Sequence, residues 1–283
     1  MLDPLSGFLA FVLVGTVFLI AKARSRTRER RRRFETPLSG EQRAILRTRV
    51  PLSRILPQAL RPRLEGLIQL FLAEKTFVGC KGVVVNDVMR TTVAGHACLL
   101  LLGGEGQEVY PELSTIYLYP STYVRRDEWA LEGGLMVRDE GVPYDGESWD
   151  RSCVVLSLAA IKEGLADFDG FNVVIHEFAH QFDALDGESN GCPPMAWDLR
   201  RRWTPLMRTA YERLVEDDRR GRETFLDPYG AENPAEFFAI LTETFFEIPH
   251  DLALEHPELY ELLQGAYGLD PRTWHPVPPP LSA

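Results

Sequence analysis

The sequence predicts an α+β fold that is mostly helical, with a few short strands and one apolar helix at the N-terminus. Long segments place apolar residues at helical spacing. By contrast, the interval 110–150 is rich in Tyr, Thr, Pro and Gly, which is typical of short strands and loops. With 283 residues, of which 45% are hydrophobic, the chain is long enough to bury a sizeable core.

The N-terminal segment 4–21, PLSGFLAFVLVGTVFLIA, is predicted to be a membrane anchor. It contains no charged residue, and as a helix it would measure about 27 Å, close to the roughly 30 Å of a bilayer's hydrocarbon core. The basic run 22–33 that follows, KARSRTRERRRR, predicts that the chain from residue 22 onward faces the cytoplasm. Because Ala21-Lys22-Ala23 resembles a signal-peptide cleavage site, removal of the segment during secretion is the alternative.

Composition divides the chain into four regions. They are a transmembrane anchor over 1–21, a basic juxtamembrane linker over 22–48, one folded domain over 49–270 and a Pro-rich tail over 271–283. The formal net charge is −10 although the linker is strongly basic, so the folded domain is acidic and nucleic-acid binding is not expected. The cysteines lack C-x-x-C spacing, and we expect them to be reduced. They are Cys80, Cys98, Cys153 and Cys192.

The elements of the folded domain are expected in the following order. Apolar residues at helical spacing predict helices over Leu60–Phe77 and Val88–Leu102, and the run VVV at 83–85 is a candidate strand. The segment CVVLSLAAIKEGL that begins at Cys153 predicts a strand that runs into a helix. Further helices are predicted near 171–183, near Ala196–Glu216, and as a pair over Asn233–Leu263.

The helix predicted near 171–183, FNVVIHEFAHQFD, contains the spacing H-E-x-x-H. On a helix, His176 and His180 lie one turn apart on one face, so their imidazoles can converge on a single ion. Glu177 lies about 100° round the helix from His176, within reach of a water on that ion. Zinc fits such ligands, because a catalytic zinc site needs only three protein ligands and a water. The alternative is a core helix whose two histidines are satisfied by hydrogen bonds.

A third ligand is expected in the segment 227–247, DPYGAENPAEFFAILTETFFE. Asn233 followed by proline is typical of a helix start, which places Glu236 at the third helical position. Glu236 then either reaches back to the Asn233 amide in a capping box or completes a zinc site of two histidines and one glutamate. Glu243 shares a face with Glu236 on an otherwise Phe-rich helix, which favours the site. Tyr229, in the preceding turn, is a candidate to point its phenol at the same ion.

The two segments FNVVIHEFAHQFD and YGAENPAEFFAILTETFF together resemble the Mlc titration factor A family of bacterial zinc metallopeptidases. The resemblance covers roughly residues 50–268 and includes the opening PLSRILPQALRPRLEGLIQLFLAEK. It implies a zincin-like metallopeptidase fold of the gluzincin type, similar to the peptidase domain of lethal factor. It also implies that zinc is bound by His176, His180 and Glu236.

The same resemblance assigns roles to residues beside the ligands. Glu177 would activate water, and Tyr229 matches the tyrosine seven residues before the ligand glutamate. Many related zinc peptidases carry an aspartate four residues after that glutamate, whereas this sequence has Ile240. Because zinc-bound imidazoles usually donate their other N–H to a carboxylate, Asp183 and Glu243 are the candidates for that role.

The function implied by the resemblance is that of a zinc-dependent, aminopeptidase-like hydrolase of peptide or protein substrates. In known members the family also implies a protein partner, a transcriptional repressor involved in glucose control. The alternative function is therefore a regulatory binding protein that sequesters such a repressor and has weak or vestigial peptidase activity. With the predicted anchor, the chain would be a single-pass protein of the bacterial inner membrane, with its catalytic domain in the cytoplasm.

Overall fold

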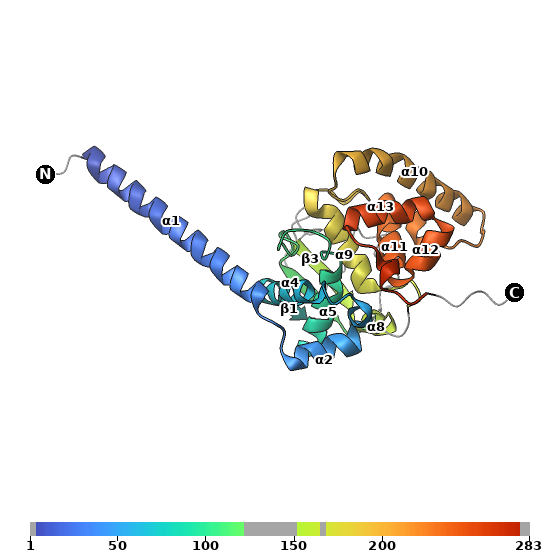
Figure 1. Cartoon of the computed structure of the whole chain (residues 1–283), viewed down its shortest axis with the longest axis horizontal. Coiled ribbons are helices and arrows are strands. Elements are labelled where there is room, and N and C mark those ends of the chain that lie inside the picture. The colour runs from blue at the N-terminus through green and yellow to red at the C-terminus, as the bar shows by residue number, and fades with distance from the viewer. Residues whose placement is uncertain (1–3, 122–151, 165–167, 278–283) are drawn as a thin grey trace.

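Helices make up most of the structure, and they pack against one small sheet (Figure 1). The computed structural model describes residues 4–121, 152–164 and 168–277, and inside the first helix it describes side chains for residues 15, 16 and 19 onward. The helices and the small sheet confirm the predicted α+β fold, which is mostly helical. In chain order the elements are α1 (Pro4–Glu35), α2 (Gly40–Arg49), α3 (Leu52–Ile55), α4 (Arg61–Glu74), β1 (Thr76–Gly79), α5 (Asp87–Leu99), β2 (Thr115–Tyr119), β3 (Cys153–Ser157), α8 (Leu158–Glu163), α9 (Val173–Asp183), η1 (Ala184–Asp186), α10 (Trp197–Arg219), η2 (Pro228–Ala231), α11 (Pro234–Glu247), α12 (Pro249–Glu255), α13 (Pro257–Tyr267) and η3 (Pro271–Thr273).

The described strands form a sheet of order β1-β2-β3 in which both pairings are parallel. Thr115 of β2 pairs with Thr76 of β1 and with Cys153 of β3. Parallel neighbours need a crossover connection, and α5 lies in the connection between β1 and β2. Along β2, buried residues alternate with half-buried ones, and Ile116 and Leu118 are fully buried. The sheet therefore directs one row of β2 side chains into the core.

The predicted strand that runs into a helix is confirmed as β3 followed by α8. Ser157 ends the strand and caps the helix, since its Oγ accepts the Ala160 N–H at 3.3 Å. The candidate strand at 83–85 was wrong. Lys81 and Gly82 have φ values of 49° and 84°, and they close a turn in which the Val83 N–H donates to the Cys80 carbonyl at 3.0 Å. The valine run therefore follows a turn after β1 and does not extend the sheet.

The predicted helical pair over Asn233–Leu263 is in fact three helices, α11, α12 and α13. Pro249 and Pro257 stand at the first positions of α12 and α13. Because proline has no N–H to donate, each of them ends the preceding helix and begins the next one. The remaining helix predictions, over Leu60–Phe77, Val88–Leu102 and Ala196–Glu216, are confirmed as α4, α5 and α10 with shifted ends.

The end of α1 is fixed to the folded body. Arg30 donates from Nε to Glu74 at 2.7 Å and from Nη1 to Glu108 at 2.9 Å. Phe34 packs against Gly66 of α4, where an added Cβ would lie 2.5 Å from the Phe34 carbonyl oxygen. Only glycine permits this close approach of the two helices. Part of the predicted linker is thus helical and packed, while the predicted domain boundaries stay a prediction.

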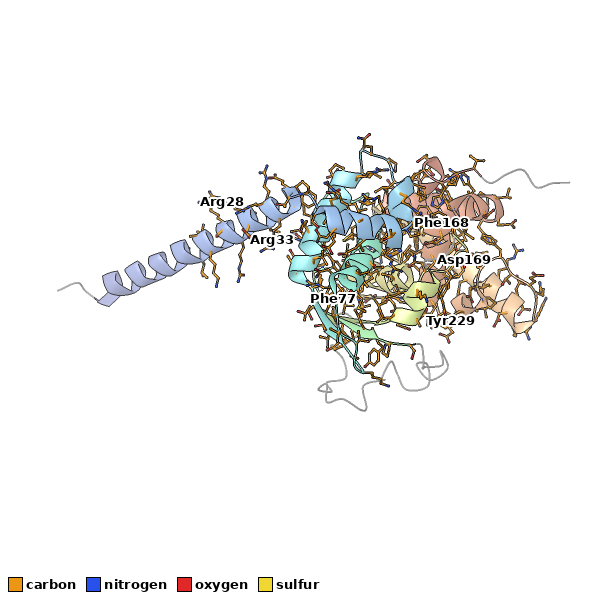
Figure 2. All side chains as sticks on the ribbon, turned by 90° about the horizontal axis from the view of Figure 1, so that it is seen from below. Arg28, Arg33, Phe77, Phe168, Asp169 and Tyr229 are labelled. Atoms are coloured by element: carbon orange, nitrogen blue, oxygen red, sulfur yellow. The ribbon has the colours of Figure 1, made fainter. Side chains whose placement is uncertain are left out.

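The predicted membrane anchor is not supported by the structure. Among the residues whose side chains are described, no helix is both long enough and apolar enough to span a bilayer. The anchor predicted over 1–21 falls largely outside them, because the side chains of 1–14, 17 and 18 are not described. Figure 2 shows Arg28 and Arg33 of the basic run on the later part of α1, where both side chains are exposed.

Aromatic side chains pack along one face of helix α9. The Phe178 ring packs on Tyr110 and Phe71, with centroid distances of 4.9 and 5.6 Å. One turn further along the same face, Phe182 stacks on Tyr267 at 4.7 Å. Each fully buried ring of this kind contributes about 1.5–3 kcal/mol through the apolar area it removes from water. These rings fix α9 in the core, where it also contacts α11.

Candidate metal centre

Helices α9 and α11 run antiparallel and bring the predicted site residues together. Asn172, at the start of α9, hydrogen-bonds with Glu247 at the end of α11. His176, one turn along α9, hydrogen-bonds with Glu236 near the start of α11. Asn172 also begins α9 as its N-cap, because its Oδ1 accepts the Ile175 N–H at 3.1 Å. Residues about 60 to 75 positions apart in the chain thus share one site.

The start of α11 places Glu236 at the third helical position, as predicted. Asn233 is the N-cap, and its Oδ1 accepts the N–H groups of Ala235 and Glu236 at 2.9 and 3.0 Å. The Glu236 carboxylate is directed at the two histidines, with Oε2 2.9 Å from His176 Nε2 and 3.5 Å from His180 Nε2. The capping-box alternative would have turned it back to the Asn233 amide. The side chain of Asn233 therefore caps the helix without a returning bond from Glu236.

Two imidazole nitrogens and one carboxylate oxygen converge on a common point. The ligand atoms of His176, His180 and Glu236 all lie within 4.8 Å of one another. The two imidazole rings are 5.0 Å apart at an angle of 81°, so both can direct a nitrogen to the same place. Two histidines and a glutamate are a ligand set that zinc accepts in catalytic sites. In the part of the chain that the structure describes, this donor set fits zinc and leaves a position for water.

The surroundings of His176 are strongly negative. Burial would lower the pKa of its imidazole, but the hydrogen bonds to Glu236 and Glu243 outweigh burial and raise the pKa to about 10. Burial also opposes ionisation of Glu236, yet the hydrogen bonds from His176 and His180 hold the pKa of this carboxyl well below its usual range. Carboxylates that stabilise a positive charge on His176 equally favour a divalent cation between the same ligands.

Of the two carboxylates proposed to orient a histidine, Glu243 does so. Its Oε1 lies 2.7 Å from His176 Nδ1, and the side chain is fully buried. Asp183 is also buried, but its Oδ2 accepts the Gly191 N–H at 2.7 Å and the Ser189 hydroxyl at 3.3 Å. Glu243 fixes His176 in the tautomer that carries its proton on Nδ1, which leaves Nε2 as the metal-facing atom. Where many related zinc peptidases have an aspartate, this chain has Ile240. Glu243, about one turn further along α11, supplies the carboxylate for His176.

Glu177 and Tyr229 flank the ligand group. Glu177 follows His176 on α9, and burial raises the pKa of its carboxyl, against the opposing effect of the two histidines. A carboxylate with a raised pKa is a stronger base than an exposed one. Tyr229 lies in η2, held by Asp227, whose Oδ1 accepts the Tyr229 N–H at 2.8 Å. Its ring centroid is 6.0 Å from that of His176.

The family model of the glucose-regulated metallo-peptidase M90 matches residues 24–268 of the chain. The chain belongs to this family. The M90 match includes both ligand-bearing helices, α9 and α11, and most of the described body. It confirms a metallopeptidase-type protein, and it agrees with the two His and one Glu that converge here.

Curated relatives of this M90 chain support the predicted resemblance. A protein of Synechocystis sp., itself described as uncharacterised, is 40% identical over 241 residues, which is 84% of this chain and 87% of the relative. The Mlc titration factor A of Serratia proteamaculans is 34% identical over 78% of this chain and 85% of its own. That of Yersinia pestis is 31% identical over 78% and 82%. Membership in the Mlc titration factor A family is therefore confirmed.

Two polar residues of the M90 site were not singled out from the sequence. Asn172 and Glu247 are 3% exposed, and both connect to the histidine-bearing helix through hydrogen bonds. A sequence signal existed for each. Asn172 is a typical N-cap residue four positions before His176, and Glu247 continues the face that carries Glu243. Nothing in the sequence indicated that the two residues meet, because their contact depends on how α9 packs on α11.

Proposed function

We propose that this M90 protein is a zinc-dependent peptidase, aminopeptidase-like, that hydrolyses peptide bonds. The observation that carries the proposal is the convergence of His176 Nε2, His180 Nε2 and Glu236 Oε2, with Glu177 on the same helix. A structural zinc site would close its fourth position with a protein ligand and would have no use for a base. Three ligands and an adjacent carboxylate are instead what hydrolysis requires.

In the proposed mechanism, His176, His180 and Glu236 would hold the zinc. When bound, zinc supplies Lewis-acid polarisation of the scissile carbonyl and lowers the pKa of water. Glu177 accepts the proton of the attacking water and passes it to the leaving amine. Its partly buried position favours this, since burial raises the pKa of the carboxyl. Tyr229 donates a hydrogen bond from its phenol to the developing oxyanion.

The second candidate function is a regulatory binding protein that sequesters a transcriptional repressor. The observation that favours it is the name of the relatives, Mlc titration factor A, which links those proteins to Mlc. This function needs neither Glu177 nor a zinc ion with a position for water. The presence of Glu177 beside the complete ligand group therefore favours the peptidase.

We further propose that residues 4–21 attach the protein to the inner membrane with its body in the cytoplasm. Support comes from the uncharged segment and the basic run that follows it. A reporter that is active only outside the cytoplasm, fused after Ala283, should be silent in cells. Strong reporter activity would contradict this orientation and favour secretion.

The peptidase proposal is tested by hydrolysis of chromogenic aminoacyl substrates and of the same peptides with a blocked N-terminus. We expect cleavage of the free-amine substrates, its loss on treatment with a chelator, and its return when zinc is added. Cleavage of blocked peptides alone would replace the aminopeptidase-like activity by an endopeptidase. If the zinc-loaded protein hydrolysed no substrate but captured a repressor, the regulatory binding protein would be the better account of its function.

A further inference from the structure

A buried polar cluster joins the start of α9 to the end of α11, beyond the ligand group itself. Its members are Asn172, Glu243 and Glu247, which are 3%, 0% and 3% exposed. The neighbouring α11 residues Phe245 and Phe246 are fully buried and apolar. Burying two glutamates and an amide among such residues is costly unless each polar atom finds a partner. Packing of two helices alone does not require this cluster.

Besides the helical hydrogen bond that its carbonyl accepts from the His176 N–H, Asn172 makes three hydrogen bonds with three different groups. Its Oδ1 accepts the Ile175 N–H and caps α9 at 3.1 Å. Its side-chain Nδ2 donates to Glu247 Oε1 at 2.9 Å, and its backbone N–H donates to Glu243 Oε2 at 2.5 Å. The cap uses only the first of these bonds. The other two tie the start of α9 to two carboxylates of α11.

These contacts fix the carboxylate of Glu243 at both oxygens. Oε2 accepts the Asn172 backbone N–H, and Oε1 faces His176 Nδ1 at 2.7 Å. With both oxygens held, the carboxylate plane cannot rotate away from the imidazole. Glu247 in turn holds the Asn172 side chain, so the backbone N–H that grips Glu243 is itself held in place.

We propose that Asn172 and Glu247 are positioning residues for the metal ligand His176, and that they act through Glu243. The inference rests on the proposed zinc site. The chain of contacts runs from Glu247 to Asn172, to Glu243 and then to His176 Nδ1. It sets the angle at which His176 Nε2 meets the ion. Partners outside the ligands commonly change metal affinity about 10- to 100-fold.

The test uses variants that separate this positioning from helix capping. Asn172→Ser keeps an oxygen for the Ile175 N–H and keeps the backbone N–H, but it loses the donor to Glu247. Glu247→Ala removes the acceptor, and Glu247→Gln restores one. Asn86→Ser is the matched control, because Asn86 caps α5 by accepting the Met89 N–H and that helix carries no metal ligand.

Zinc affinity is measured on the full chain by competition with a chromogenic chelator, and cobalt-substituted protein is compared by visible absorption. We expect about 10-fold weaker zinc binding and a changed cobalt spectrum for Asn172→Ser and Glu247→Ala. Glu247→Gln should lie within about twofold of the unaltered protein, as should Asn86→Ser. If Glu247→Ala does not fold, the comparison of Asn172→Ser with Glu247→Gln and Asn86→Ser decides.

Three results would overturn the inference. The first is unchanged zinc affinity and cobalt spectrum in Asn172→Ser and Glu247→Ala. The second is an equal loss of affinity in Asn86→Ser, which would show general loosening of the fold. The third is failure of the unaltered protein to bind zinc, which would remove the proposed function as well. The first two leave the zinc site standing, so the failure of the inference and that of the site are distinguishable.

Discussion

Two buried histidines on contacting helices, His96 on α5 and His176 on α9, have opposite surroundings. His96 Nδ1 donates to the Thr92 carbonyl at 3.0 Å, and its Nε2 has no hydrogen-bond partner among the residues that the structure describes. Burial lowers the pKa of His96 to about 4. His176 is bonded at both nitrogens by Glu236 and Glu243, which raise its pKa to about 10.

The difference shows that burial alone does not give a histidine the surroundings of a metal ligand. Burial keeps the isolated imidazole of His96 neutral, and the loss of its hydration is unfavourable. His176 is instead surrounded by carboxylates of α11. Both helices are apolar in sequence, so α5 represents the core-histidine alternative that α9 also allowed. The carboxylates of α11 separate the two cases.

The largest expected effect concerns Glu177, which has no counterpart beside His96. Glu177→Gln keeps the size of the side chain but removes the proton acceptor. We expect the rate of peptide hydrolysis to fall about 100- to 10,000-fold while zinc content stays at the level of the unaltered protein. The rate of substrate hydrolysis and the zinc content, measured on the same preparations, check this prediction.

Glu212→Gln on the exposed face of α10 is the control, since it makes the same charge change away from the site. Full peptidase activity of Glu177→Gln would contradict the role of this residue as the proton acceptor in hydrolysis. If Glu177→Gln bound no zinc, Glu177 would instead be a zinc ligand.

The next prediction concerns the pH dependence of stability from His96. Its pKa is about 4 in the folded protein and near 6.5 when unfolded, so the unfolded chain binds more protons between these values. The free energy of unfolding should therefore fall as pH decreases from about 6.5 to 4, and we expect His96 to account for about 3 kcal/mol of that loss.

Chemical denaturation at pH 7 and pH 4.5, on protein freed of metal with a chelator, measures this effect. His96→Leu should lose clearly less stability between the two pH values than the unaltered protein does. His275, whose pKa is also lowered to about 4, leaves a residual slope of the same sign. An identical pH dependence in both proteins would mean that His96 is not held neutral by burial.

A smaller effect is expected at the start of α11. Asn233→Ala removes the acceptor for the Ala235 and Glu236 N–H groups and should lower the free energy of unfolding by about 1 kcal/mol. Glu236→Gln keeps that cap and should instead weaken zinc binding. The two variants therefore separate capping from metal binding. A loss of stability in Glu236→Ala equal to that in Asn233→Ala, with zinc binding intact, would restore the capping-box interpretation, because alanine, unlike glutamine, cannot accept the Asn233 N–H.

The sequence predicted those parts of the site whose geometry depends on one helix. The spacing of His176 and His180 on α9 and the position of Glu236 after its cap follow from helical periodicity and capping. The contact between Asn172 and Glu247, 75 positions apart, depends on how α9 packs on α11. The turn at Lys81 and Gly82 was missed for a different reason. Gly82 is a local turn signal, but the valines that follow it favour strands.

Zinc content of His176→Ala, His180→Ala and His96→Leu tests the central claim most directly. Purified chains are loaded with zinc, freed of excess metal and analysed for metal per chain. We predict one zinc per chain in the unaltered protein and in His96→Leu, and little zinc in the two α9 variants. Full zinc content in both His176→Ala and His180→Ala would contradict the account, because the ion would then be held elsewhere.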